Sequence, residues 1–343
     1  MMMEQMRKKA EYMKAIIYEK YGPPDVLQLQ EVPSPEPASN EILVKIHASP
    51  INYGDISARN FANIPFSEFN MPSFLLLFAK LAFGLIGPRN KILGSEFSGV
   101  IDDIGEKVTK FKKGDPVFGY TGMKMGAHSE YLCMKETGTI ALKPTNMSHK
   151  EASAIPYGGI MAQGILDKVE VKKGDRVLVN GASGGIGSIA VQLLKHYGAE
   201  VTGVCSVERM DYVKALGADF VLDYKKNDLR TGGKRYNLVF DILGRLDWSV
   251  CKEILTEQGI FLLASFKTIK LLQMLKTAIF GNKKVICAFG SEKQSDLERI
   301  KDLVEDGKLK TIVDRVFLLE EESKAHDYYE KKLNRGHVIL KIV

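Results

Sequence analysis

A glycine-rich segment at residues 180–187 (NGASGGIG) constrains the fold of this chain more than any other feature. It follows the apolar run RVLVN directly and leads into SIAVQLLKHYG, in which Ile189, Leu193 and Tyr197 fall on one face of a helix. Glycines let a backbone turn sharply and approach a ligand closely, and the N-terminus of the following helix attracts negative charge. Strand, loop and helix in this order predict a turn that binds a pyrophosphate, rather than a plain tight turn.

The region from about residue 150 to residue 290 alternates between strand and helix patterns. Its strands are short and almost continuously apolar, which is typical of a parallel sheet covered by helices on both faces. The expected strands lie at 176–180, 200–205, 220–224, 238–243, 260–265 and 285–290, and the expected helices at 188–198, 207–216, 247–257 and 267–280. Six strands in this pattern predict a Rossmann fold, a doubly wound parallel sheet that binds a dinucleotide.

The chain before and after this region has a different pattern. From residue 13 to about residue 145, Gly, Pro and Asn separate short apolar runs, which predicts a β-rich, barrel-like domain. The tail, with an expected helix at 295–310, strand at 313–319, helix at 320–333 and strand at 337–343, is predicted to return to that domain. At roughly 100–200 residues per domain, 343 residues make two domains. The expected bounds are 13–145 and 290–343 for the first domain, 146–289 for the Rossmann domain and 1–12 for an N-terminal extension.

Composition excludes several classes of protein. The four cysteines form no CxxC pair, which argues against a disulfide framework and favours a reducing, cytoplasmic setting. The net charge of +6 is spread over separate lysine pairs, so we expect no nucleic-acid partner. The apolar stretch 71–87 is interrupted by Lys80 and is shorter than the roughly 18 apolar residues of a membrane span, so we expect no stable membrane insertion. Its helix, at 74–85, is interpreted as a lid or wall of a substrate site, an interface helix or a core helix.

The end of the second Rossmann strand indicates which nucleotide binds. Enzymes that use NAD usually carry Asp or Glu there, but this strand ends at Cys205 and Ser206. Ser206 can donate to a 2′-phosphate, Arg209 can pair with it, and Tyr224 can flank the adenine. Glu208 argues for NADH instead, because its carboxylate can reach the ribose hydroxyls. The pattern predicts NADPH rather than NADH.

Motifs along the whole chain are shared with a known superfamily. They are MKAIIYEKYG (13–22), SPINYGD (49–55), GSEFSG (94–99), KGDPVFG (113–119), AHSEYL (127–132), the glycine loop, LGAD (216–219), DILG (241–244) and the terminal GHVILKI. From Met13 to Val343 the chain resembles the medium-chain dehydrogenase/reductase superfamily, most of all its zinc-free quinone oxidoreductase branch. The resemblance implies an α/β protein with a GroES-like β-barrel catalytic domain, a Rossmann domain and NAD(P)H-dependent oxidoreductase activity. It also implies a homodimer paired through the edge strand at 285–289.

Positions that bind metal in zinc-dependent relatives carry other residues here. The relatives' early Cys-His pair corresponds to Asn52 and Tyr53, and their Gly-His-Glu corresponds to Gly94, Ser95 and Glu96. His128 and Cys133 are near each other in sequence, but two candidate ligands without a third do not make a site. We therefore predict that the chain binds no metal.

Without zinc, the natural substrate is one that is already electrophilic, such as a quinone or an α,β-unsaturated carbonyl. We predict that Tyr53 stabilises the oxygen on which negative charge develops, although aromatic packing is an equally good interpretation of this residue. Asn52 is predicted to contact the nicotinamide or its ribose. The predicted cofactor-binding residues are Asn52, Gly181, Ala182, Ser183, Gly184, Gly185, Ile186, Gly187, Ser206, Arg209, Tyr224, Leu243, Gly244 and Ser265.

Two other functions fit the same features. An enoyl-thioester reductase would need a longer channel and a basic patch for its carrier. A non-catalytic, NADPH-binding structural or sensor protein would retain the glycine loop, but Asn52 and Asp55 on the chemical side argue against it. The YxxxK pattern at 131–135 precedes the glycine loop, whereas short-chain reductases need it afterwards, so we interpret it as chance.

Overall fold

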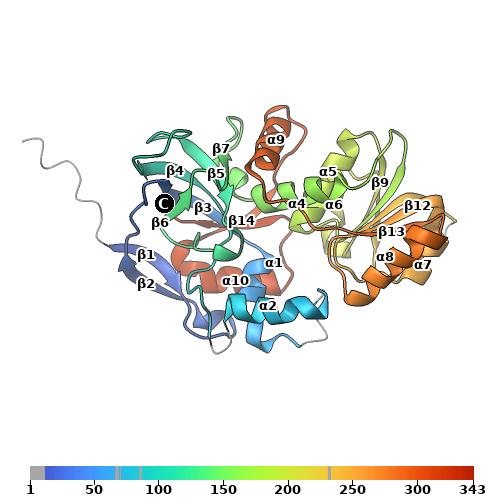
Figure 1. Ribbon diagram of the computed structural model, residues 1–343, viewed down its shortest axis with the longest axis horizontal. Coiled ribbons are helices and arrows are strands. Elements are labelled where there is room, and N and C mark those ends of the chain that lie inside the picture. Colours follow the sequence, from blue (N-terminus) through green and yellow to red (C-terminus); the bar gives the residue numbers. More distant parts are fainter. Residues whose placement is uncertain (1–11, 66–68, 70, 85–86, 231–232) are drawn as a thin grey trace, which may run out of the picture. The chain divides into compact units, whose positions relative to one another are not determined.

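The computed structural model describes residues 12–65, 69, 71–84, 87–230 and 233–343, and the chain divides into two compact units (Figure 1). Unit 1 comprises Met1–Asn63, Phe83–Pro156 and Val313–Val343. Unit 2 comprises Ile64–Ala82 and Tyr157–Ile312. The chain passes between the units at 156/157 and 312/313, later than the changes of pattern at 145/146 and 289/290.

Unit 1 is built on a mostly antiparallel sheet around one long strand, with one parallel pair, β14 and β15. The order is β14-β15-β3-β4-β5-β7, and β6 also pairs with β3. These strands are β3 (Glu41–Ile51), β4 (Glu96–Ile104), β5 (Pro116–Tyr120), β6 (Tyr131–Lys135), β7 (Thr139–Leu142), β14 (Val313–Leu318) and β15 (His337–Lys341). A separate ribbon pairs β1 (Tyr12–Ile17) with β2 (Gln28–Pro33). Because β15 pairs with β3, the last strand of the chain joins the sheet that β3 to β7 form.

The helices of unit 1 are short and lie at the ends of these strands. They are α1 (Tyr53–Arg59), α3 (His149–Ser153) and α10 (Glu322–Glu330). The expected helix at 320–333 is shorter in the structure, since a 3₁₀ turn at Leu319–Glu321 precedes α10 and Lys331 ends it. Apolar side chains of β1, α1, α10 and β15 form one buried cluster, which includes Ile16, Ala58, Ala325 and Val338. This cluster anchors α1 and α10 within the same unit.

Unit 2 contains the predicted Rossmann sheet. Six parallel strands have the order β10-β9-β8-β11-β12-β13, which is the doubly wound order with the first strand in the middle. They are β8 (Arg176–Asn180), β9 (Glu200–Cys205), β10 (Phe220–Asp223), β11 (Tyr236–Asp241), β12 (Leu255–Leu263) and β13 (Lys284–Cys287). The fold class predicted from the strand and helix alternation is thus confirmed.

Helices connect the strands of unit 2. They are α4 (Pro156–Leu166), α5 (Gly185–His196), α6 (Met210–Ala215), α7 (Trp248–Ile254), α8 (Thr268–Phe280) and α9 (Gln294–Glu305), and α2 (Ser73–Phe83) lies mostly in this unit. The prediction of a helix through residue 257 is wrong: α7 ends at Ile254, and Leu255 already pairs with Tyr236 of β11. Leu255 is fully buried against the sheet core, so its packing there extends the strand at the expense of the helix.

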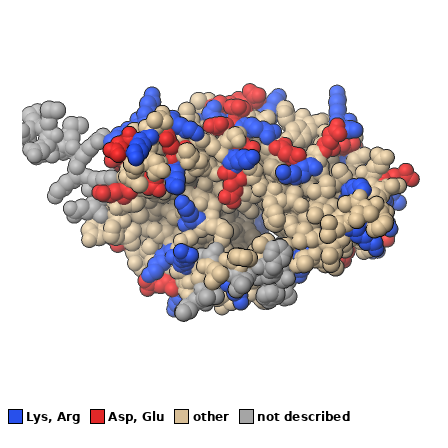
Figure 2. All heavy atoms as spheres, viewed as in Figure 1, with Lys and Arg blue, Asp and Glu red and all other residues tan. Residues whose placement is uncertain are grey.

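Over the residues described, none of the helices is both long and apolar enough to cross a membrane. On the face seen in Figure 2, Lys and Arg side chains alternate with Asp and Glu, and no single basic block is visible.

Candidate functional site

The glycine loop of unit 2 has a backbone that only glycine fits at key positions. Gly181 follows β8 with φ +89°, which side chains with a Cβ rarely adopt. A Cβ at Gly187 would overlap the carbonyl oxygen of Gly181, whereas a Cβ at Gly185 would meet nothing within 4 Å. Helix α5 therefore begins tightly packed against the loop, with open space in front of its first turn. These are the properties of a turn that holds a pyrophosphate, so the residues fit a dinucleotide.

Four predicted cofactor residues come together where β8, β11 and β12 end. Leu243 would contact a Cβ on Gly181 at 2.9 Å, and Gly244 adopts φ +65° beside the carbonyl of Ser265. Buried Asp241 holds this edge together. Its carboxylate accepts from the side chain of Asn180 at 2.8 Å and from the backbone N–H groups of Gly244 and Leu246 at 3.0 and 2.8 Å. Burial raises the pKa of Asp241, which those three donors oppose.

The predicted nucleotide-selecting residues lie at the neighbouring strand ends. Ser206 and Arg209 belong to the turn after β9, and exposed Tyr224 donates its backbone N–H to the carbonyl of Cys205 at 3.2 Å. Glu208 lies among them, and hydrogen bonds from its own backbone N–H and from the Ser206 hydroxyl lower its pKa. The positive charges of Lys225 and Arg209 act in the same direction. Lys225 was missed at the sequence level; its place directly after Tyr224 was the available signal.

In unit 1, Asn52 follows β3 and caps α1. Its side-chain oxygen accepts from the N–H of Asp55 at 3.1 Å, and the Asp55 carboxylate accepts from the N–H of Asn52 at 2.9 Å, which is a reciprocal capping box. The side-chain amide of Asn52 donates to Ser95 Oγ and Glu96 Oε2, both at 3.1 Å. The positions that hold zinc ligands in relatives thus form a hydrogen-bonded group in this chain.

Tyr53 is the first residue of α1, and 70% of its surface is exposed in the structure. Aromatic packing at a strand end, the other interpretation of this residue, does not describe an exposed helical position. Its hydroxyl is therefore available to a ligand. Asn52 and Tyr53 belong to unit 1, and the remaining predicted site residues belong to unit 2.

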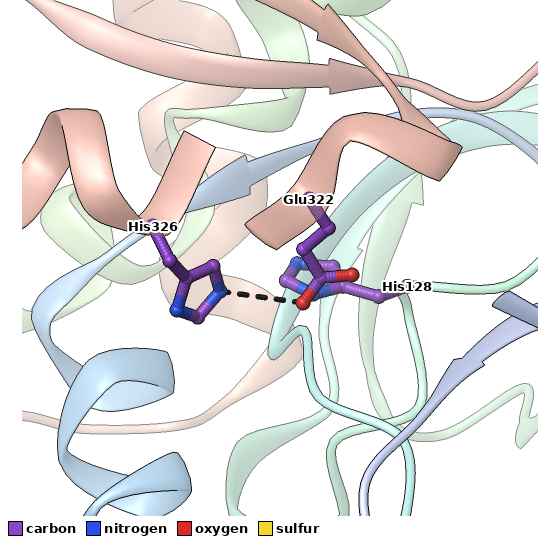
Figure 3. A group of neighbouring side chains, drawn as sticks. All are labelled: His128, Glu322 and His326. Carbon is purple, nitrogen blue, oxygen red and sulfur yellow. Dashed lines mark hydrogen bonds and ion pairs between the residues drawn. The ribbon is translucent and has the colours of Figure 1, made fainter. Parts of the chain in front are cut away.

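Sequence reasoning missed a buried polar cluster in unit 1, formed by His128, Glu322 and His326 (Figure 3). All three side chains are fully buried. Glu322 Oε1 lies 2.8 Å from His128 Nδ1 and 3.3 Å from His326 Nε2. Among the described residues these three have ligand atoms close enough to consider for a metal ion. The spacing of Glu322 and His326, four apart on a helix, was the signal in the sequence.

Charge pairing dominates the protonation of this cluster. Burial is the largest single effect and would lower the pKa of His128, but the charge and hydrogen bond of Glu322, the charge of Asp55 and the carbonyl of Pro50 together outweigh it and raise that pKa to about 9. Burial would likewise raise the pKa of Glu322, but His128 and His326 lower it to about 2. At neutral pH, His128 and Glu322 therefore form a buried ion pair.

Comparisons with known proteins agree across both units. Residues 38–144 match the model of the alcohol dehydrogenase GroES-like domain, and residues 216–340 match that of the zinc-binding dehydrogenase family. The chain is 31% identical to a chloroplastic quinone-oxidoreductase homolog of Spinacia oleracea, over 97% of this chain and 98% of that protein. It is 28% identical to a chloroplastic NADPH-dependent alkenal/one oxidoreductase of Arabidopsis thaliana, over 96% and 79%. The solved quinone oxidoreductase of Coxiella burnetii superposes with a TM-score of 0.80 and 30% identity, covering 97% and 100% of the two chains.

Proposed function

The chain belongs to the quinone oxidoreductase branch of the medium-chain dehydrogenase/reductase superfamily and is an NAD(P)H-dependent oxidoreductase, and from this membership we propose that it reduces quinones or α,β-unsaturated carbonyls with NADPH. The observation that carries the proposal is the edge of the Rossmann sheet. There the glycine loop, Leu243, Gly244 and Ser265 leave open space at the first turn of α5. We assign unit 2 to cofactor binding and unit 1 to the chemistry.

The chemical side of the proposal rests on hydrogen-bond donors. When bound, reduced nicotinamide supplies a hydride to the electrophilic carbon of the substrate. The hydroxyl of Tyr53 donates to the substrate oxygen, on which negative charge grows during the reduction. The amide of Asn52, held by Ser95 and Glu96, orients the nicotinamide or its ribose. We propose that no zinc takes part, because Asn52, Tyr53 and Ser95 stand where relatives carry Cys and His ligands.

The preference for NADPH rests on Ser206 and Arg209. The strand tip itself carries no acid, and Lys225 adds a second positive charge near the expected 2′-phosphate. Glu208 lies close by, but the Ser206 hydroxyl and Lys225 bind or attract its carboxylate in the structure. We propose that a bound 2′-phosphate accepts from the Ser206 hydroxyl and pairs with Lys225 in place of the Glu208 carboxylate.

We further propose a cytoplasmic homodimer. Strand β13 is at the edge of the six-stranded sheet, and the outward face of the preceding helix α8 is apolar. Its exposed large apolar side chains are Ile269, Leu272, Leu275, Ile279 and Phe280, the last with 82% of its surface exposed, and Lys276 is exposed among them. A second copy paired along β13 would cover such a surface. Light scattering on the purified chain tests this; a monomer at micromolar concentration would contradict it.

The experiment that tests the activity follows oxidation of NADPH and NADH with a panel of quinones, enals, enones and enoyl thioesters, with and without a metal chelator. We expect NADPH-dependent turnover of quinones or enals that the chelator does not change. Loss of activity with chelator would contradict the metal-free assignment. Tight binding of NADPH with no turnover of any substrate would contradict the enzymatic assignment.

A further inference from the structure

The cluster of His128, Glu322 and His326 is joined by hydrogen bonds to α1. Arg59 on α1 lies with Nη1 2.9 Å from His326 Nδ1, and its Nη2 donates to Glu330 Oε1 at 2.8 Å. His128 Nε2 lies 3.4 Å from the carbonyl oxygen of Pro50, in the strand that leads to Asn52. The cluster thus joins α10, the loop before β6 and both sides of the Asn52 turn within unit 1.

The partners of the rings determine where their protons lie. A guanidinium can only donate, so Nδ1 of His326 accepts from Arg59 and the proton of the neutral ring is on Nε2, which lies 3.3 Å from Glu322 Oε1 without forming a hydrogen bond. A carbonyl oxygen can only accept, so Nε2 of His128 carries a proton toward Pro50. Neither Nε2 then has a lone pair for a metal ion, and the positive charge of Arg59 lies beside the cluster. This donor set fits a bound proton between His128 and Glu322 better than a bound cation.

Asp55 connects this cluster to Asn52. Its Oδ2 accepts from the N–H of Asn52 at 2.9 Å, and its Oδ1 accepts from the N–H of Gly94 at 3.1 Å. Both bonds are strongest when the carboxyl group is ionised, since a protonated carboxyl oxygen is a weaker acceptor than a carboxylate oxygen. Gly94 packs so closely on His128 that a Cβ there would overlap the imidazole ring. Gly94 thus links the two residues: its N–H donates to the Asp55 carboxylate, and its Cα lies against the His128 ring.

The charges around Asp55 decide whether it stays ionised. Burial raises the pKa of Asp55, and the positive charge of His128 is the largest effect that lowers it. His326 lowers it further, whereas Glu322 raises it. Tyr18, which directly follows β1, also faces this group, and its own pKa is raised by burial and by Tyr21, Asp55 and Glu322. Within the part of the chain that the structure describes, His128, His326 and Glu322 are the charges that shift the pKa of Asp55, while Arg59, Glu330 and Glu96 lie next to them.

We propose that the His128–Glu322 ion pair is a positioning device for the active site: it keeps Asp55 ionised and thereby holds Asn52 in its cap at the start of α1. His128, Glu322 and Asp55 are positioning residues, because they act through Asn52. The role of Asn52 rests on the proposed function, but the state of the ion pair does not. In this arrangement His128 is protonated at neutral pH, and its two ring nitrogens face Glu322 and the carbonyl oxygen of Pro50.

The test is the pH profile of kcat/KM in a Glu322→Gln variant, which keeps the size of the side chain and removes its charge. Without the carboxylate, burial lowers the pKa of His128, so less positive charge remains beside Asp55. The loss of the Glu322 charge acts in the opposite direction, but His128 has the larger effect on Asp55, so Asp55 takes up a proton at higher pH. We expect the acidic limb of the profile to move up by about one pH unit or more, with activity recovering toward that of the unaltered protein at alkaline pH. A merely structural defect would lower the whole profile instead.

The matched control is Glu330→Gln, which removes a carboxylate from the same helix and from the same Arg59, at a position that is partly exposed. Its acidic limb should coincide with that of the unaltered protein. A Glu322→Gln profile that coincides as well would overturn the proposal.

A second measurement does not depend on the variant folding or on catalysis. In histidine-labelled protein at pH 7, ¹⁵N spectra should show one imidazolium that stays protonated to about pH 9, assigned as His128 by its loss in His128→Gln. A neutral His128 at pH 7 would overturn the inference. Zinc added at one equivalent should leave the His128 and His326 signals unchanged, and shifted signals would show a metal site instead. If no substrate of the panel is turned over, NADPH affinity against pH replaces kcat/KM, so failure of the proposed function is told apart from failure of the ion pair.

Discussion

The candidate site of unit 2 is formed mainly by backbone, whereas that of unit 1 is formed mainly by side chains. In unit 2 the cofactor turn is formed by backbone: the left-handed Gly181 and the close approach of Gly187 to Gly181 occur within one short run of sequence. In unit 1 the side chain of Asn52 bonds to nearby Asp55 and to Ser95 and Glu96, which are more than 40 residues away in the sequence. Backbone sites of the first kind tolerate few residue types, whereas side-chain sites of the second kind depend on partners that only the fold brings together.

The largest effect is expected at Gly187. A Gly187→Val variant places side-chain atoms where the carbonyl of Gly181 already lies, so the loop has to move away from α5. We expect NADPH affinity to fall by about 100-fold or more, because the backbone N–H groups of the loop no longer lie where they can donate to the pyrophosphate. Titration followed by nicotinamide fluorescence measures the change.

Gly184→Ala is the matched control for that variant. A Cβ at Gly184 would meet only the carbonyl of Gly181, at an ordinary 3.5 Å, so the loop keeps its shape. Its loss of affinity should stay below about ten-fold. Equal losses in the two variants would mean that the close packing of Gly187 does not decide cofactor binding.

The next effect is expected at Tyr53, on the other unit. Tyr53→Phe removes one hydroxyl from a side chain that is mostly exposed, so stability should hardly change. We expect kcat to fall about 10- to 100-fold with NADPH affinity unchanged, because a donor to the developing oxyanion is lost. Tyr12→Phe, at another exposed tyrosine, is the control and should keep full turnover. Unchanged kcat in Tyr53→Phe would remove this residue from the mechanism.

How much of each site could be predicted follows from this difference. The Rossmann strands and the glycine loop depend on local pattern, and their positions agree with the sequence to within a few residues. The strand β12 was misjudged because Leu255 packs into the sheet core, which local helical pattern does not reveal. The cluster of His128, Glu322 and His326 was missed for a related reason. Residues 128 and 322 lie far apart in the chain and meet only through the packing of α10 in unit 1.

The choice of nucleotide tests a part of unit 2 that does depend on side chains. Ser206→Asp places a carboxylate beside the expected 2′-phosphate, where Glu208 is already negative. We expect the ratio of kcat/KM for NADPH over NADH to fall about ten-fold or more, since like charges repel at short range. Ser295→Asp, an exposed serine on α9 of the same unit, adds the same charge elsewhere and should leave the ratio unchanged. A ratio unaffected by Ser206→Asp would contradict the assignment of the strand tip.

The smallest effect concerns the stability of unit 1 as pH changes. The pKa of His128 is raised to about 9 in the folded chain, so its contribution is complete below pH 6.5 and is lost as pH rises through about 9. The pKa of Glu322 is lowered to about 2, so its contribution is present above pH 4.5 and is lost as pH falls toward 2. The ion pair therefore stabilises most between about pH 4.5 and pH 6.5.

Thermal unfolding of the unaltered protein and of Glu322→Gln measures this contribution as a difference. Apart from His128 and Asp55, the titratable groups are expected to behave alike in both proteins, so the gap between the two Tm values should be widest near pH 6 and should narrow by a few degrees toward pH 9. Glu330→Gln should follow the unaltered protein with a nearly constant offset, because its exposed carboxylate pairs with Arg59 and not with a titrating histidine. If the gap for Glu322→Gln is also constant from pH 6 to pH 9, His128 holds no proton that Glu322 stabilises. The packing of unit 1 around α10 would then not depend on a charge pair, just as the glycine loop of unit 2 depends on close backbone packing and not on charge.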